Sequence, residues 1–179
     1  MQLIEFDTRL QADLVAKTQA GDRRAFGRIY DETFPQIYRY ALALTHNRED
    51  AEDLTAETYE RALRRIHSYE SRDVPIAIWL LRIARNVGHE RSQRSMREST
   101  VTVSEERIDQ IAANPDSLEA GLLLAGFLRE LTPAQRDVIA LRLAGLRCRE
   151  IAQALGKAEG TIKALQFAAI RNLRRTALQ

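Results

Sequence analysis

Hydrophobic positions recur with the spacing of an α-helix through most of the first half of the chain. Gly21 separates the first two predicted helices, Asn47 is placed to cap the third, and Pro75 stands in the first turn of the fourth, where proline is tolerated. The pattern therefore predicts a helical N-terminal domain over residues 1–95. Its expected helices span residues 8–20, 22–44, 47–67 and 75–94.

The pattern changes between Ser95 and about Ser117, where polar residues and an Asn-Pro-Asp turn replace the helical periodicity. We interpret residues 96–117 as a flexible linker and residues 118–179 as a second helical domain. Thr132 and Pro133 are a cap followed by a first-turn proline. The fold class is thus all-α, with two small helical domains. The helices expected in the second domain span residues 118–131, 133–143, 149–155 and 159–175.

The last two of these helices, with a glycine turn at Gly156, have the form of a helix-turn-helix, a motif that places its second helix in the DNA major groove. At 100° per residue, Ile162, Leu165, Ala169 and Leu173 fall on one side, which we expect to pack inward. Phe167 falls on the other side, where it could contact a thymine methyl or a protein partner. The cations that share the side of Phe167 are Lys163, Arg171 and Arg174.

Two neighbouring helices carry opposite charge. On the helix after Asn47, five carboxylates lie opposite the apolar face, so they are either solvated or meet a basic protein. The helix after Pro75 has a basic stripe flanked by Trp79, which could stack on a single strand or anchor the core. The carboxylates are Glu49, Asp50, Asp53, Glu57 and Glu60, and the stripe comprises Arg82, Arg85 and His89 with Asn86 beside it and Arg91, Arg94 and Arg97 after it.

Composition excludes several classes of protein. The net charge is +2, yet residues 1–60 hold 12 acids and 7 bases whereas residues 61–97 hold 9 bases and 3 acids. The longest apolar run is far too short to cross a bilayer, and the acidic N-terminus is not a secretory signal. A single cysteine and three scattered histidines predict neither a disulfide nor a metal site. We expect no enzyme activity and no cofactor, and a cytoplasmic location.

Four segments in this order resemble the extracytoplasmic-function (ECF) sigma factors, the minimal sigma subunits of bacterial RNA polymerase. The resemblance covers about residues 13–175 and implies binding to core RNA polymerase and to promoter DNA. It also implies control by an anti-sigma factor. The segments are residues 50–59, 79–87, 131–139 and 159–163.

The resemblance assigns residues to three surfaces. Polymerase binding is implied for Asp50, Asp53, Leu54 and Glu57. Recognition and opening of the −10 promoter element is implied for Trp79, Arg82, Arg85, Asn86, His89, Arg91 and Arg94. Recognition of the −35 element as duplex is implied for Arg149, Thr161, Lys163, Phe167, Arg171 and Arg174.

The chain departs from the common family pattern at Ala56, where many members have Gln, and at Ala158, where many have Ser. Phe167 stands where a polar or basic residue is common. Two alternatives remain open on the residues: an interaction protein that has lost DNA binding, and a helix-turn-helix regulator that acts without polymerase. The retained basic residues argue against the first, and the acidic helix argues against the second.

Overall fold

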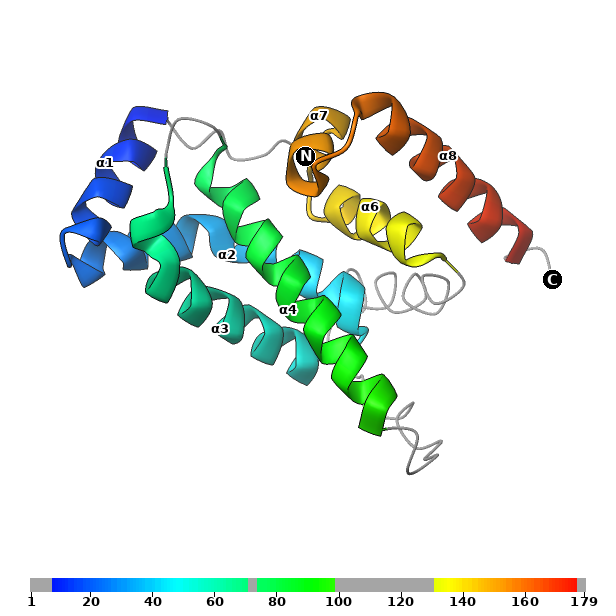
Figure 1. Cartoon of the computed structure of the whole chain (residues 1–179), viewed down its shortest axis with the longest axis horizontal. Coiled ribbons are helices and arrows are strands. Elements are labelled where there is room, and N and C mark those ends of the chain that lie inside the picture. Colours follow the sequence, from blue (N-terminus) through cyan, green and yellow to red (C-terminus); the bar gives the residue numbers. More distant parts are fainter. Residues whose placement is uncertain (1–7, 71–73, 99–130, 177–179) are drawn as a thin grey trace.

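The computed structural model describes residues 8–70, 74–98 and 131–176, and these residues form helices joined by short turns, with no strand among them (Figure 1). The all-α fold class is therefore confirmed. The helices are α1 (Thr8–Gln19), α2 (Arg23–Thr45), α3 (Arg48–Arg65), the 3-10 turn η1 (Ile66–Ser68), α4 (Ile76–Glu98), α6 (Pro133–Leu143), α7 (Cys148–Leu155) and α8 (Glu159–Thr176).

Helices α1 to α4 form the first group, with α2 in contact with each of the other three. Asp22 begins α2 because its carboxylate accepts hydrogen bonds from the backbone N–H groups of Arg24 and Ala25, at 2.8 and 3.3 Å. The amide oxygen of Asn47 likewise accepts from the backbone N–H of Glu49 at 2.8 Å, which confirms it as the cap of α3. The fully buried centre of this group includes Ile29, Ile37, Tyr40, Leu54 and Leu80.

Helices α6, α7 and α8 form the second group. Thr132 and Gln135 make a reciprocal capping box at the start of α6, so the predicted cap is confirmed. Gly156 ends α7 with φ +62° and ψ +37°, a left-handed conformation that costs glycine nothing and costs other residues strain. This glycine lets the chain turn at once into α8, and the result is a helix-turn-helix.

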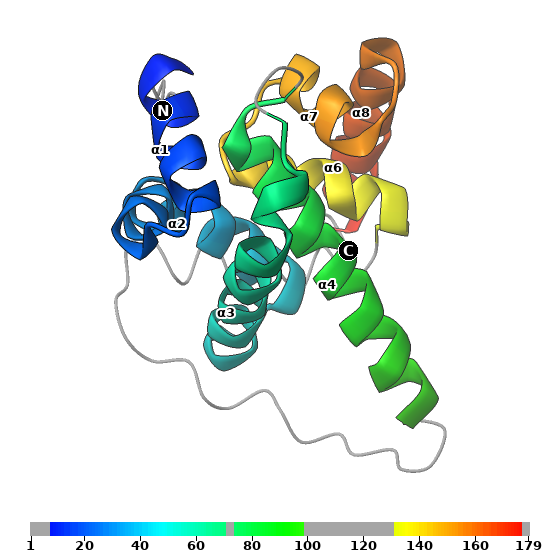
Figure 2. The same cartoon turned by 60° about the vertical axis from the view of Figure 1, so that its left-hand side comes forward.

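The two groups pack against each other. Helix α6 lies on α2 and α7 lies on α4, while α8 is on the far side of α6 and α7 (Figures 1 and 2). Buried apolar residues of both groups, among them Leu141 and Ile151, belong to one continuous core. The second group therefore covers part of the surface of α4 that the first group would otherwise expose.

The described helices agree with the expected ones to within a few residues at each end. Helix α4 extends to Glu98, into the segment interpreted as a linker, because no Gly or Pro occurs between Gly88 and Asn114 to stop it. The expected helix over residues 118–131 and most of the linker lie outside the described residues. No helix in the described part of the chain combines the length and hydropathy needed to cross a bilayer.

Candidate nucleic-acid and polymerase interfaces

Helix α8 presents the outward face that its sequence predicts. Ile162 and Ala169 are fully buried against the rest of the second group, and Leu165 and Leu173 are half-buried. On the opposite side Phe167 is 71% exposed, which places the ring outside the core. The basic residues that share this exposed side are Lys163, Arg171 and Arg174.

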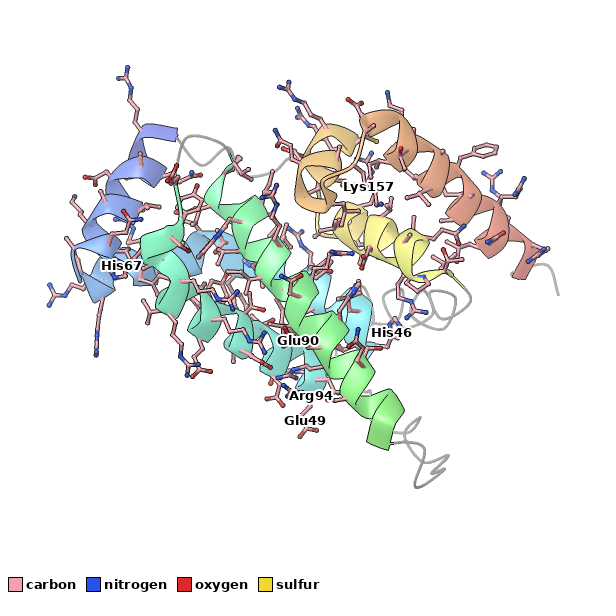
Figure 3. All side chains as sticks on the ribbon, in the orientation of Figure 1. His46, Glu49, His67, Glu90, Arg94 and Lys157 are labelled. Carbon is pink, nitrogen blue, oxygen red and sulfur yellow. The ribbon has the colours of Figure 1, made fainter. Side chains whose placement is uncertain are left out.

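Further exposed polar groups lie in α7, in the turn before α8 and in the first turn of α8. Arg149 in the first turn of α7 and Thr161 in the first turn of α8 are exposed, and Lys157 lies in the turn between them (Figure 3). Lys163 is 3.1 Å from Glu159, but both side chains are largely exposed, so this pair is weak and leaves Lys163 free to exchange partners. An exposed aromatic ring among exposed cations suits a surface that meets a nucleic-acid groove.

The basic stripe of α4 is turned toward the second group of helices. Arg85 donates from Nε to Oδ2 of Asp137 on α6 at 2.7 Å, and His89 Nε2 is 3.2 Å from Oδ1 of the same carboxylate. Arg82 donates to the backbone carbonyl of Gln153 on α7 at 2.5 Å. In this structure, then, three residues implied in −10 recognition are occupied by contacts within the chain.

Other members of the −10 set lie outside that contact. Asn86 and Arg94 are exposed, and Arg94 follows Glu90 along the outer part of α4 (Figure 3). Trp79 is half-buried, with its ring centroid 5.2 Å from that of Tyr69, and it packs against the core. This position agrees with the core-anchor alternative and leaves only part of the indole accessible.

An ion-pair network joins α3 to α4 at Glu57. The carboxylate accepts from Arg61 at 2.6 Å and from Arg91 Nε at 2.8 Å, and Arg61 also binds Glu90 at 2.7 Å. Partial burial acts to raise the pKa of Glu57, but the hydrogen bonds from Arg91 and Arg61 outweigh it and hold the pKa below its usual value. Glu57 and Arg91, implied in polymerase and DNA binding respectively, are thus partners of each other.

The remaining acids of α3 form the surface available to a partner. Glu49 and Asp53 are exposed and Asp50 is half-exposed. Leu54 is 1% exposed and belongs to the core of the first group, so its implied role in polymerase binding stays a prediction. Glu52, which the sequence analysis did not single out, is exposed and accepts from Arg48 at 2.8 Å.

The residue that sequence reasoning missed is Asp137. It stands on the apolar face of α6, next to Val138, and its side chain is only 5% exposed. A carboxylate at a core position is the signal that could have indicated a buried cationic partner. Its charge also acts on Tyr40 of α2: burial, and then the charge of Asp137, raise the pKa of that phenol well above its usual value.

Comparison with known proteins assigns both groups of helices to one family. Residues 29–98 match the family model for Sigma-70 region 2, and residues 127–175 match that for Sigma-70 region 4. The ECF RNA polymerase sigma factor SigL of Mycobacterium tuberculosis is 31% identical over 166 residues, which cover 90% of this chain and 94% of SigL. The chain belongs to the ECF RNA polymerase sigma factors, which are transcription initiation factors.

Two further proteins are similar to the chain. The ECF sigma factor BldN of Streptomyces coelicolor is 38% identical over 175 residues, which cover 94% of this chain and 66% of BldN. The sigma factor RpoE of Bartonella quintana, solved in complex with the anti-sigma factor NepR, superposes with a TM-score of 0.66. That match has 24% identity and covers 84% of this chain and 94% of RpoE, so it shows a shared fold.

Proposed function

We propose that this chain binds core RNA polymerase and directs transcription initiation at promoters, acting in the cytoplasm and catalysing no reaction itself. The exposed face of α8 is the observation that carries this proposal. Three cations and an aromatic ring on the outer helix of a helix-turn-helix have no role in the core. Promoter reading explains their exposure, whereas a protein that had lost DNA binding would have no use for them.

The −35 element is the proposed target of α8. Lys163, Arg171 and Arg174 can bind phosphates, which fix the position of the helix on the duplex. Phe167 carries no charge, so we assign it contact with a base methyl group or a sugar. Arg149 and Thr161, exposed in the first turns of α7 and α8, are proposed to hold the flanking backbone.

The −10 element is the proposed target of α4. Arg82, Arg85 and His89 share one stripe with Asn86, and such a set can bind the phosphates and bases of an opened strand. The contacts from this stripe to Asp137 and Gln153 must be released first, since they use the same N–H groups.

Core polymerase is the proposed partner of the acidic surface of α3. Because Glu57 is held by Arg61 and Arg91, Asp50 and Asp53 are better positioned for the contact. Reversing both charges, Asp50→Arg with Asp53→Arg, should abolish pull-down of core polymerase without loss of helix content. The matched control reverses two exposed acids on other helices, Asp13→Arg with Asp31→Arg, and should bind normally.

Control by an anti-sigma factor is the remaining part of the proposal. It is supported by the family to which the chain belongs, and the similar RpoE of Bartonella quintana was solved bound to an anti-sigma factor. A cognate anti-sigma factor added to a transcription reaction should therefore abolish transcripts that depend on this chain.

Transcription in vitro tests the whole proposal. Purified core polymerase, a genomic fragment library and the full chain should give start sites that are absent without the chain. A chain that binds core polymerase but yields no new start sites would support the alternative of an interaction protein without promoter recognition.

A further inference from the structure

The start of α4 is tied to α1 through Tyr69, which follows η1. Tyr69 is 4% exposed, and its hydroxyl donates to the backbone carbonyl of Val74 at 2.7 Å. The same hydroxyl accepts from Nε2 of Gln11 on α1 at 3.2 Å. Gln19, the last residue of α1, donates from Nε2 to the backbone carbonyls of Ile66 and Tyr69, at 2.8 and 3.0 Å. Two side chains of α1 therefore fix both the backbone and the hydroxyl of Tyr69.

Tyr69 in turn supports Trp79 on α4. The two ring centroids lie 5.2 Å apart with an angle of 51° between the ring planes, which is contact distance for an aromatic pair. Val74 directly precedes Pro75, whose carbonyl accepts from the backbone N–H of Trp79 at 3.1 Å. The indole is thus held at its ring and at its backbone, and Tyr69 contributes to both supports. Since Trp79 is half-buried, part of the indole stays accessible.

The contact of α1 with this segment is more polar than packing alone requires. Helix α1 packs on α2 and on η1 (Figure 1), and Gln11 within it is 4% exposed. A buried amide costs free energy unless it is hydrogen-bonded, whereas an apolar side chain of that size would pack without this cost. The hydrogen bond has a direction, so it fixes the orientation of the Tyr69 hydroxyl. The match to Sigma-70 region 2 begins at residue 29, so the family model does not include α1.

We propose that Tyr69 is a positioning residue for Trp79: held by Gln11 and Gln19 of α1, it fixes the indole in an orientation in which a base of the opened −10 strand stacks on the accessible part of the ring. This inference rests on the proposed function of α4. A ring that is backed by a second, buried ring has little freedom left to lose, so it binds a base more tightly than a ring that rotates.

Tryptophan fluorescence tests whether Tyr69 holds the indole. Trp79 is the only tryptophan in the sequence, so emission from the full chain, excited where tyrosine does not absorb, reports on it alone. Tyr69→Phe removes the hydroxyl and keeps the ring, and it should lower the fluorescence anisotropy of Trp79 and raise its quenching by acrylamide. The matched control is Tyr59→Phe, which removes another buried phenol hydroxyl, 2.7 Å from Thr33 Oγ1, and should change neither quantity. Unchanged fluorescence in Tyr69→Phe would overturn the proposal.

Binding to a single strand tests the consequence for DNA. The probe is fluorescein-labelled single-stranded DNA of random sequence, because stacking on an aromatic ring tolerates any base, and the protein is the full chain assembled with core polymerase. Trp79→Leu should weaken the binding that the chain adds to core polymerase by about fivefold or more, which is what the stacking of one base contributes. Tyr69→Phe should weaken it by about threefold or more, and Tyr59→Phe by less than about twofold.

A double variant separates positioning from a general loss of stability. If Tyr69 acts through the indole, Tyr69→Phe should cause no further loss of single-strand binding in a chain that already carries Trp79→Leu. A further loss as large as that seen with Trp79 present would refute the positioning role. If Trp79→Leu loses helix content, the comparison of Tyr69→Phe with Tyr59→Phe decides the question, and equal affinities of these two variants contradict the proposal.

The part assigned to α1 has its own pair of variants. Gln11→Met removes the donor at similar volume, and it should change Trp79 fluorescence and single-strand binding in the same direction as Tyr69→Phe. Thr18→Val removes a buried hydroxyl that bonds to the carbonyl of Leu14 within α1, and it should change neither. Identical behaviour of the two variants would show that α1 does not support the indole.

Failure of the positioning role is distinguishable from failure of the proposed function. A wild-type chain that adds no single-strand binding to core polymerase would contradict the proposed function of α4, and this inference with it. Wild-type binding that Tyr69→Phe retains in full would overturn the positioning role alone.

Discussion

Replacing Glu57 with glutamine should measure how firmly α3 is fixed to α4. The wild-type carboxylate accepts hydrogen bonds from Arg61 and Arg91, and its side chain is 24% exposed. Glutamine keeps the shape and one acceptor oxygen but loses the charge that both guanidinium groups face. The change therefore weakens two charge-assisted contacts while leaving the packing of the helices intact.

The size of the loss follows from this partial burial. Hydrogen bonds to charged groups contribute about 1.5–3 kcal/mol when desolvated, and exposed ion pairs about 0–1 kcal/mol, so Glu57→Gln should cost about 1–2 kcal/mol at neutral pH. For a chain of this size the melting temperature should fall by about 2–8 °C. Glu60→Gln is the matched control, because the pair that Glu60 makes with Arg64 is exposed and should cost less than about 0.5 kcal/mol.

The pH dependence of the unfolding free energy tests the contribution of the Glu57 carboxylate in a second way. Because the pKa of Glu57 in the folded chain lies below its ordinary value of 4.5, the stabilisation is complete above that pH. It is lost as pH falls through the folded-state pKa. The difference in unfolding free energy between wild type and Glu57→Gln should accordingly shrink below pH 4.5. Thermal unfolding followed by circular dichroism measures both effects, and equal losses for Glu57→Gln and Glu60→Gln at pH 7 would refute the reasoning.

Two further predictions concern α8. Ala158 precedes the helix, and its backbone carbonyl accepts a hydrogen bond from the N–H of Ile162. Its side chain cannot cap the helix, so Ala158→Ser should supply that cap and raise the free energy of unfolding by about 1 kcal/mol in thermal unfolding. Ala164→Ser, inside the helix, should give no such gain. Phe167→Ala should leave the melting temperature and the salt dependence of duplex binding unchanged while relaxing base preference at one or two positions, each worth about 1–3 kcal/mol, in selection from a randomised duplex pool. Loss of stability in Phe167→Ala, or an unchanged selected sequence, would contradict that role.

The helices and their faces were predictable because local rules determine them. Asn47, Thr132 and Gly156 mark helix ends through hydrogen bonds and backbone conformations that depend on neighbours within a few residues. The outward position of Phe167 follows from the helical period alone. The candidate surface of α8 therefore needed no tertiary information.

The contacts made by the basic stripe of α4 depend on tertiary packing, which the helical period does not determine. The apolar face predicted for α4 is buried. Leu81, which lies outside that face and near Arg82 and Arg85, is buried as well, because α7 covers α4 on a second side. Along this part of α4 the solvent-facing side is narrow, so Arg85, whose side chain is 33% exposed, lies at the edge of the contact and pairs with an acceptor within the fold. Asp137 is that acceptor, and it lies 52 residues beyond Arg85. The polar surface proposed to bind the −10 element and the surface that packs the two groups together are thus one surface, so a mutation of Asp137, on the α6 side of this contact, should lower stability while freeing Arg85 for DNA.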